Sequence, residues 1–345
     1  GPPGQTMAGK RSFSMKTRRQ IIGLGFLASI AFSGLLPLNQ ALAQTQDWPN
    51  KAIKIIVPYP TAGVSDTIVR MLAERLTVVL GQPVVIENRA GAGATLGMDM
   101  VARATPDGYT LGFAAISPLT LNPHVMKVPY DAQKDFAPIG SAMYSPIYLL
   151  ATPKFKGKTF EDIIAMSRAN PGSITVATSG YGTVGHIMLE QLNKKTGITL
   201  THIPYKGGAQ ISTDALGGQF DLMFANPYAN LNALIEQGKL NPLAVGSPNR
   251  LANLPQMRTF AELGLPEVNL TSLFGFFAPG GTPSAIINKL NTEINKVLNE
   301  PDTQARVKKV ENLVITSTPA EFAAIIKQEF AANARIVKEA DIKAE

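Results

Sequence analysis

The chain of 345 residues has no cysteine, one tryptophan and only three histidines. Without cysteine there is no disulfide, no thiolate metal site and no cysteine nucleophile. The three histidines (His124, His186 and His202) do not form the zinc motif H-E-x-x-H, and the P-loop pattern G-x-x-x-x-G-K-[ST] is also missing. These absences count against a zinc hydrolase and a P-loop nucleotide hydrolase.

The first 43 residues are predicted to lie outside the fold. GPPGQT resembles an expression-vector remnant, and basic residues between positions 10 and 19 precede an apolar run, Ile21 to Leu36, and the tripeptide Ala41–Ala43. This order is typical of a secretory signal, with cleavage predicted after Ala43. TRRQII weakly resembles a twin-arginine signal, so both export routes stay open. An uncleaved anchor is the alternative, although the apolar run is short for a membrane span.

The excess of basic residues belongs largely to this segment. Residues 1–43 hold five of the 32 lysines and arginines and no acidic residue, which leaves 27 basic against 25 acidic residues, a net charge of +2. The formal charge of +7 for the whole chain is therefore no evidence for nucleic-acid binding. An exported chain without cysteine fits the bacterial periplasm.

Strands alternate with helices along the rest of the chain. KAIKIIVPYP (Lys51–Pro60) predicts a strand, and TAGVSD predicts a loop in which Ser65 or Asp66 caps the helix that follows. The same order of strand, glycine loop and helix recurs from Ser173, and the strand endings YTLGFA and FDLMFA match in pattern. Such alternation predicts an α/β fold with mostly parallel sheets flanked by helices.

Two such units in tandem predict two lobes joined by a hinge, with glycine loops at the carboxyl ends of the strands, where ligands bind in α/β sheets. We expect the first lobe to span residues 46–145 and 277–345, and the second lobe to span residues 146–276. A last amphipathic helix, Pro319–Ala340, is expected to return to the first lobe.

Gly180, Gly182 and Gly185 spell G-x-G-x-x-G in ATSGYGTVGHIMLEQL. A dinucleotide site also needs an acidic residue at the end of the next strand, to hold the ribose. Here that strand, ITLTHIPY, has none. The free amides of a helix N-terminus bind other anions equally well. The motif therefore favours a carboxylate, and no cofactor and no metal are expected.

Five motifs together resemble one family. IKIIVPYPTAGVSD, VVIENRAGAGATLG, ATSGYGTVGHIMLEQL, HIPYKGGAQISTDALGGQFDLMFAN and FFAPGGTP follow one another behind the signal segment. In this order they resemble the Bug, or tripartite tricarboxylate transporter, solute-binding family. The resemblance implies a type II periplasmic binding fold that captures a small carboxylate, often a dicarboxylate, and delivers it to a membrane transporter. It implies no enzymatic activity and no nucleic-acid partner, and a monomer is expected.

Three departures from the family pattern concern the predicted pocket. Ala62, Gly63 and Val64 stand where the family usually has two glycines, and Leu273 stands where it often has tryptophan. Ala225 replaces a common acidic residue, which speaks against an amino-acid ligand.

The predicted ligand site draws on the glycine loops of both lobes. Main-chain amides and hydroxyl groups are expected to hold one carboxylate in each lobe. From the first lobe we expect Tyr59, Thr61, Ala62, Gly63, Val64, Ser65, Asp66, Gly93, Ala94, Thr95 and Ser117. From the second lobe and the return strand we expect Ser179, Gly180, Gly182, Thr183, His186, Tyr205, Gly207, Asn226 and Phe274.

Simpler roles remain open for these residues. The glycines can serve tight turns alone, Ser65 and Thr183 can be helix caps, and His186 and Phe274 can be packing residues. Arg89 is expected to pair with Glu87 or a neighbouring residue rather than with a ligand.

Other functions remain open as well. A hydrolase using Ser179 and His186 is disfavoured, because Ala177 breaks G-x-S-x-G. A receptor that reports to a membrane sensor kinase is the other alternative.

Overall fold

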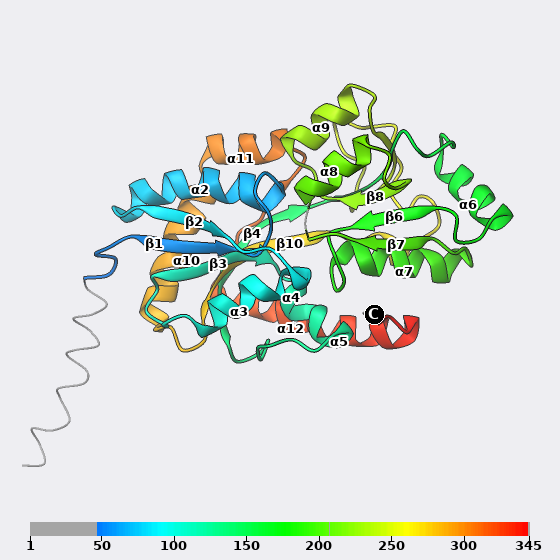
Figure 1. The fold of residues 1–345 in the computed structure, drawn as a ribbon. Helices are drawn as coiled ribbons and strands as arrows, with labels where there is room; N and C mark the ends of the chain where they lie inside the picture. Colours follow the sequence, from blue (N-terminus) through cyan, green and yellow to red (C-terminus); the bar gives the residue numbers. More distant parts are fainter. Residues whose placement is uncertain (1–46, 207, 344–345) are drawn as a thin grey trace, which may run out of the picture. The chain divides into compact units, whose positions relative to one another are not determined.

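Two β-sheets, one in each lobe, organise the chain (Figure 1). The structure is a computed structural model and describes residues 47–206 and 208–343. The predicted signal segment and its cleavage site after Ala43 lie outside the described residues, and so does Gly207.

The sheet of the first lobe has six strands in the order β11-β4-β10-β3-β1-β2. Pairing shows that β1, β2, β3 and β4 run in one direction, while β10 and β11 run in the other. Its strands are β1 (Ile53–Val57), β2 (Val84–Asn88), β3 (Thr110–Ala115), β4 (Phe136–Ser145), β10 (Ser272–Pro279) and β11 (Leu313–Val314). Its helices are α2 (Val64–Leu80), α3 (Thr95–Arg103), α4 (Ser117–Thr120), α5 (Asn122–Val125), α10 (Ser284–Leu298), α11 (Pro301–Lys309) and α12 (Pro319–Ala340).

The sheet of the second lobe has five strands in the order β7-β6-β8-β5-β9, and only β5 runs against the other four. Its strands are β5 (Ile147–Ala151), β6 (Thr175–Thr178), β7 (Thr201–Pro204), β8 (Leu222–Ala225) and β9 (Asn241–Gly246). Its helices are α6 (Phe160–Ala169), α7 (Val184–Thr196), α8 (Gly208–Leu216) and α9 (Ala229–Glu236). The predicted α/β architecture is therefore present, with an inserted antiparallel strand in each sheet.

The chain passes between the two sheets twice. It leaves the first sheet at the end of β4, enters β5 after Pro146, and returns to the first sheet at Ser272, where β10 begins. Both passages lie close together, because the Asn226 side chain donates hydrogen bonds to the Pro146 carbonyl (3.1 Å) and to the Ser272 hydroxyl (3.2 Å). The proposed lobe limits, 145/146 and 276/277, stay a prediction.

Helix ends follow local chemistry, with one correction. α12 begins with the capping box Thr318–Glu321 and spans the predicted Pro319–Ala340. The prediction that Ser65 or Asp66 caps α2 was wrong, because the helix already begins at Val64 and its N-cap is Gly63. The Asp66 carboxylate instead accepts hydrogen bonds from the amide of Ala62 (2.9 Å) and from Arg70 (3.0 Å), which holds the preceding loop against the helix.

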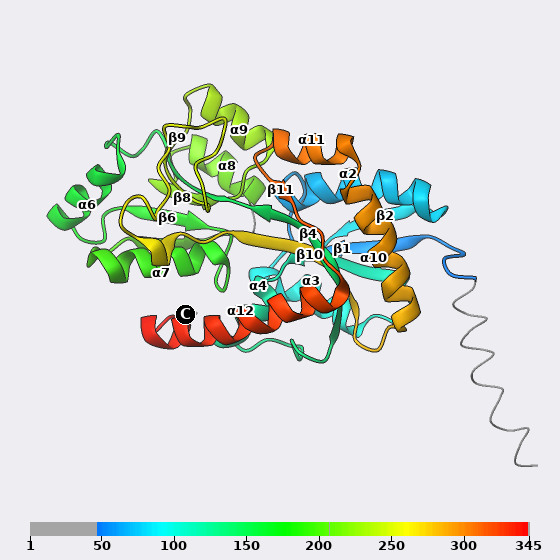
Figure 2. The same ribbon diagram turned by 180° about the vertical axis from the view of Figure 1, so that it is seen from behind.

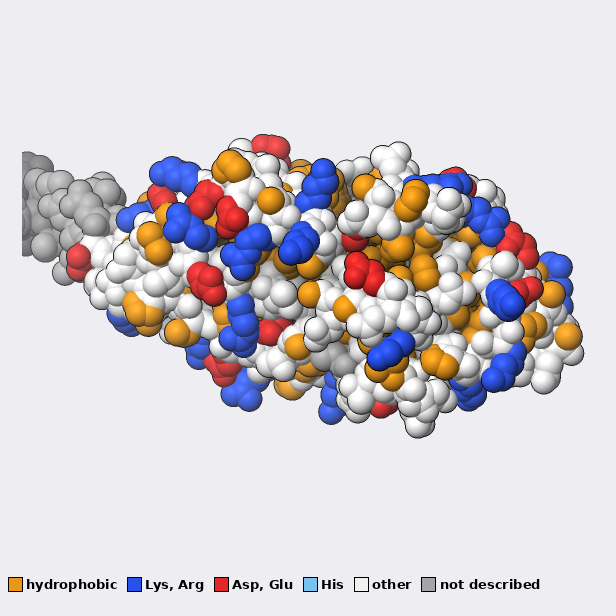
Figure 3. Space-filling model, turned by 90° about the horizontal axis from the view of Figure 1, so that it is seen from above, with side chains coloured by type: hydrophobic (Ala, Val, Ile, Leu, Met, Phe, Trp, Pro, Cys, Tyr) orange, Lys and Arg blue, Asp and Glu red, His pale blue; other side chains and the backbone are white. Residues whose placement is uncertain are grey.

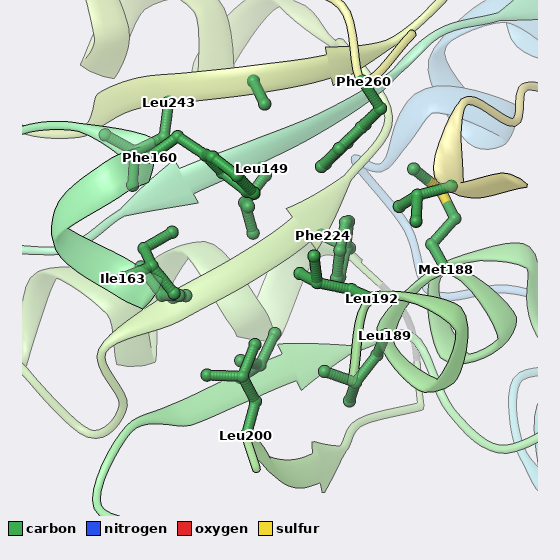
Figure 4. Close-up of a cluster of buried hydrophobic side chains, with 14 of the residues drawn as sticks. Leu149, Phe160, Ile163, Met188, Leu189, Leu192, Leu200, Phe224, Leu243 and Phe260 are labelled. Atoms are coloured by element: carbon green, nitrogen blue, oxygen red, sulfur yellow. The ribbon is translucent and has the colours of Figure 1, made fainter. Parts of the chain in front are cut away.

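Each lobe has its own hydrophobic core. Figure 4 shows that of the second lobe, where Leu149 of β5 and Phe224 of β8 pack with Leu189 and Leu192 of α7 and with Phe260. The first lobe buries a separate cluster that includes Phe277 of β10 and Phe322 of α12. Burying a side chain of this size contributes about 1.5–3 kcal/mol, so each sheet is held to its helices independently.

A third cluster joins the lobes. Leu121, Val337 and Ile342 pack against Ile187 of α7, and Figure 2 shows α12 running beneath the first sheet toward that helix. The helix predicted to return to the first lobe thus also touches the second.

Basic and acidic side chains are interspersed on the face shown in Figure 3, as expected for a mature chain of small net charge. No helix in the described part of the chain has both the length and the hydrophobicity to span a membrane.

Candidate functional site

A cavity of about 70 Å³ lies where the two lobes meet the passages between them. Both lobes contribute to its lining, and so do β5 and β10 beside the passages. About 10–15 Å³ is enough for one water molecule, so the cavity has room for a larger guest.

The first lobe contributes the N-terminus of α2 to the lining. Gly63, Val64 and Ser65 line the cavity there. The amides of Val64 and Ser65 have no hydrogen-bond partner among the described residues, because the first intrahelical bond reaches back only from Thr67 to Gly63. An uncapped helix end of this kind attracts an anion through its free N–H groups and its dipole.

Hydroxyl groups surround that helix end. Ser65 and Ser117 are 2% and 6% exposed, line the cavity, and have side chains with no hydrogen-bond partner among the described residues. The Tyr59 hydroxyl accepts a hydrogen bond from the Ala115 amide (3.3 Å), and burial raises the pKa of this phenol. All three hydroxyl groups are therefore protonated at neutral pH and available as donors to a bound anion.

The second lobe contributes the N-terminus of α7. Thr183, Val184 and Gly185 line the cavity, and the amides of Val184 and Gly185 have no partner within the described part of the chain. This end is capped, because the Thr183 hydroxyl accepts a weak bond from the amide of His186 (3.4 Å). Ser179, in the loop before α7, adds a hydroxyl with no partner among the residues that the structure describes.

No charged side chain belongs to the described lining of the cavity. Two helix N-termini and several hydroxyl groups would therefore have to neutralise a bound anion, without an arginine or lysine. Arg89 is paired with Glu87 (2.9 Å), as predicted, and Arg70 is paired with Asp66. Within residues 47–206 and 208–343, no group of His, Cys, Asp or Glu side chains is arranged to hold a metal ion.

The glycine loops of the two lobes touch one another beside the cavity. A Cβ atom added to Gly93 of the first lobe would lie 2.4 Å from the carbonyl oxygen of Tyr181 in the second. A Cβ atom on Gly182 would lie 2.8 Å from the side chain of Asn122, whose amide donates to the Gly93 carbonyl (2.9 Å). Both glycines have positive φ, 62° and 72°. These loops therefore need glycine in order to approach each other.

Two stacked histidines support the loop of the second lobe. The rings of His186 and His202 are 4.7 Å apart and nearly parallel, and Tyr181 packs edge-on against both. The Gly182 amide donates to Nδ1 of His186 (3.1 Å), and His202 Nε2 lies 2.5 Å from the Thr178 hydroxyl. Burial lowers the pKa of His186 to about 3 and that of His202 to about 4, so both are neutral at pH 7.

The chain matches the family model described as "Tripartite tricarboxylate transporter family receptor" over residues 68–342. It is 34% identical to Protein BugT of Bordetella pertussis, over 86% of this chain and 91% of BugT. The chain belongs to this receptor family.

Solved structures agree with that assignment. The periplasmic binding protein BugD is 32% identical, with a TM-score of 0.81 over 86% of the receptor and all of BugD. A protein of R. palustris solved with adipate has a TM-score of 0.81 and 28% identity over 86% of the receptor and 100% of that chain. MatC of Rhodopseudomonas palustris, solved with bound malate, has a TM-score of 0.79 and 28% identity over 84% and 100% of the two chains. The receptor thus has the fold of the periplasmic binding proteins and belongs to a family of solute-binding proteins, not of enzymes.

Nine residues predicted to bind ligand lie together in the lining of the receptor's cavity. They are Tyr59, Gly63, Val64, Ser65, Ser117, Ser179, Thr183, Asn226 and Phe274. Thr183 is also the cap of α7, as one of its two predicted roles requires, and its contact with a ligand stays a prediction.

The other predicted residues lie outside this lining, apart from Gly207, which is outside the described residues. Ala62 and Asp66 bond to each other, Thr61 is exposed, and Thr95 bonds to the Ala92 carbonyl. Gly93, Ala94, Gly180, Gly182 and His186 form or support the touching loops. The Tyr205 hydroxyl donates to Asp214 (2.6 Å), and burial is the main reason that its pKa rises to about 12.

Several residues that line the cavity were not predicted from the sequence. Tyr228 follows the carboxyl end of β8 by three positions, so the rule that indicated Asn226 could have indicated it too. Ile147, Ile211 and Phe224 have no local signal, because apolar residues of strands and helices are equally typical of a core. Ser272 is polar but stands at the start of β10, not after the carboxyl end of a strand.

Proposed function

We propose that the receptor captures a small carboxylate, specifically a dicarboxylate, between its two lobes and delivers it to a membrane transporter of the tripartite tricarboxylate type. One observation carries the proposal: two helix N-termini with unpartnered amides, one from each lobe, open into the same uncharged cavity.

A carboxylate suits these donors. Hydrogen bonds from amides and hydroxyl groups to an ionised acceptor are roughly twice as strong as bonds between neutral groups. Two donor sets on opposite lobes match two acid groups on one small molecule. The adipate and malate found in the two R. palustris proteins are both dicarboxylates, which supports this ligand class for the receptor.

Closure of the lobes would complete the site, because each lobe holds only one set of donors. The two passages at Pro146 and Ser272 provide the hinge, and Asn226 links both of them to the cavity lining. We propose the predicted limit 145/146 for the first passage and move the second limit from 276/277 to 271/272, because β10 begins at Ser272 and lies in the first sheet.

The proposed location is the periplasm, reached by export and cleavage after Ala43, with the mature receptor a monomer. Expression of the full chain followed by periplasmic extraction tests this part. The expected product begins at Gln44 by intact mass and elutes as a monomer, whereas an unprocessed, membrane-bound product would contradict it.

The ligand is tested on that periplasmic product by a thermal-shift screen of acetate, succinate, glutarate, adipate, malate and citrate. A ligand at 100 times its dissociation constant adds about 2.7 kcal/mol of stability. We expect at least one dicarboxylate to raise the melting temperature, with the corresponding diamide inactive as the uncharged control. AMP, ATP and NAD are added to the panel, and a rise in melting temperature with these nucleotides alone would refute the proposal.

The transporter partner is tested by cross-linking the loaded receptor in membranes that contain the transporter. Recovery of a sensor kinase in place of transporter subunits would replace delivery with signalling.

A further inference from the structure

The lining of the cavity divides into donor groups and hydrocarbon. The donors are the helix ends and serine hydroxyl groups described above. The hydrocarbon comes from side chains of strands β3, β5, β8 and β10 and of helices α7 and α8. It consists of Ile147, Val184, Ile211, Phe224 and Phe274, with Ala115 and Ala225.

The hydrocarbon part is firmly held. Phe274 stacks on Phe113 with ring centres 6.0 Å apart and meets Tyr59 edge-on at 6.3 Å. Phe224 packs against Phe260 in the core of the second lobe, and Ile211 is fully buried. These side chains cannot turn away to expose polar groups without breaking core packing.

Apart from the serine hydroxyl groups, which are assigned to the acid groups of the ligand, few hydrogen-bond acceptors for a substituent belong to the described lining. Thr183 donates its hydroxyl to the Gly180 carbonyl (2.7 Å), and the Tyr228 hydroxyl is bonded to Ser212. Asn226 donates from Nδ2 to the Pro146 carbonyl and to the Ser272 hydroxyl, so only its amide oxygen is available to a ligand. No carboxylate belongs to the described lining, so an ammonium group would be buried there without a counter-charge.

We infer that the receptor selects a carboxylate whose body is plain hydrocarbon, and discriminates against hydroxyl and ammonium substituents on that body. This inference rests on the proposed function, because the acid groups are assigned to the two helix ends. The body between them then lies against the apolar residues, where a methyl group gains contact and a polar group loses water. A hydroxyl substituent could still donate to the amide oxygen of Asn226 or to a serine oxygen, so the penalty for a hydroxyl is smaller than that for an ammonium.

A series on one skeleton tests the inference by calorimetric titration. Methylsuccinate, succinate, malate and aspartate carry a methyl group, hydrogen, a hydroxyl and an ammonium at the same carbon. We expect methylsuccinate to bind at least as tightly as succinate, malate about tenfold more weakly, and aspartate at least about a hundredfold more weakly. If glutarate or adipate binds better than succinate, the matching substituents are compared on that skeleton.

The outcomes separate the two proposals. Binding of malate or aspartate as tight as that of methylsuccinate overturns the hydrocarbon inference and leaves carboxylate capture intact. Failure of every carboxylate to bind overturns the proposed function itself.

A pair of variants of nearly equal shape locates the effect. Ile211→Val removes one methylene group, and Ile211→Thr has nearly the shape of the valine variant with a hydroxyl in place of one methyl group. We expect the valine variant to keep the preference for succinate over malate. The threonine variant should bind succinate several-fold more weakly than the valine variant. Its ratio of succinate affinity to malate affinity should be at least threefold smaller. Equal ratios of succinate affinity to malate affinity in the two variants would show that Ile211 does not face the ligand and would overturn its place in the selection.

Discussion

The two helix ends at the cavity are built differently, although both follow a strand and a glycine-containing loop. α2 begins after Gly63 with no side-chain cap, and its free amides are joined by the unpartnered hydroxyl of Ser65. α7 is capped by Thr183, and the loop before it is braced by the bond from Gly182 to His186. The first lobe therefore leaves more hydrogen-bond donors for a ligand. In the second lobe, some of the polar groups near the helix end bond to one another.

The loops differ in backbone strain as well. Three alanines in the first-lobe loops, Ala62, Ala92 and Ala94, have positive φ, between 52° and 75°. In the corresponding loop of the second lobe, the residues with positive φ are glycines, Gly180 and Gly182. A left-handed alanine costs about 1–2 kcal/mol, and strain of this kind often lies at binding sites. The comparison indicates that the first lobe is the stronger anchor and the second a preformed partner.

The largest expected effect comes from blocking the contact between the loops. Gly93→Ala places a Cβ atom 2.4 Å from the Tyr181 carbonyl of the other lobe, so closure is hindered and affinity for the preferred dicarboxylate should fall at least about a hundredfold. Gly81→Ala is the matched control, because Gly81 has a similar φ of 71° and nothing within 4 Å of its added Cβ atom. Both variants should lose similar stability, and only Gly93→Ala should lose binding. Equal affinities by titration would show that the loops need not meet.

The next effect compares the two anchors directly. Ser65→Ala removes a buried hydroxyl with no internal bond and should weaken dicarboxylate binding about tenfold, because a hydrogen bond to a charged group contributes about 1.5–3 kcal/mol. Its melting temperature should not fall. Thr183→Ala should show the reverse pattern, losing about 1 kcal/mol of stability with the cap and less than threefold in affinity. If Thr183→Ala instead lost affinity and Ser65→Ala lost stability, the second lobe would be the main anchor.

The histidine stack should make the second lobe sensitive to pH. Below pH 6.5 the unfolded chain binds protons at His186 and His202, whereas the folded receptor does so only near pH 3 and pH 4. The free energy of unfolding should therefore be highest above pH 6.5 and should fall as the pH drops toward 4. The fall is about 1.4 kcal/mol per pH unit for each histidine.

Denaturant titrations between pH 7 and 4.5 measure this slope. Glu161 and Glu262, whose pKa values are lowered to about 2 by pairing with arginines, lose their contribution only below this window. Burial raises the pKa of Glu190, which lies 3.8 Å from His186, and this opposes the trend. His202→Gln should flatten the slope, and a wild-type receptor with no slope would exclude the buried pair as its source.

The smallest effect concerns the strained alanine. Ala62→Gly should raise stability by about 0.5–1 kcal/mol, because glycine adopts a φ of 67° without strain, less the entropy that glycine adds to the unfolded chain. Affinity should stay within about twofold if Ala62 lies outside the lining, as the structure places it. A drop in stability would mean that the strain is not released at this position.

Much of the fold was predictable from local patterns. The alternation of strands and helices, the pairing of each glycine loop with a helix start, and α12 from Pro319 to Ala340 all follow from periodicity and capping signals. The N-cap of α2 was not predictable in this way, because Ser65 and Asp66 both fit a cap by residue type. In the structure, hydrogen bonds from Ala62 and Arg70 hold Asp66 inside the first turn.

The candidate site was predictable only in part. Residues directly after strands, such as Ser179 and Asn226, share the carboxyl edge of the sheet, so they could be named from the chain alone. Gly93 and Gly182 belong to the same class of loop, yet they contact the facing lobe, which no local pattern describes.

The amino-acid order by itself determined the family, through five motifs in order, and the two α/β units with their glycine loops, because motifs, periodicity and glycine spacing are local properties of a chain. Only the tertiary structure decided which loops face the cavity, which loops contact each other, and which apolar side chains line that cavity. Those outcomes depend on how two separately packed cores meet at the passages beside Pro146 and Ser272, and that geometry is a property of contacts between residues far apart in sequence.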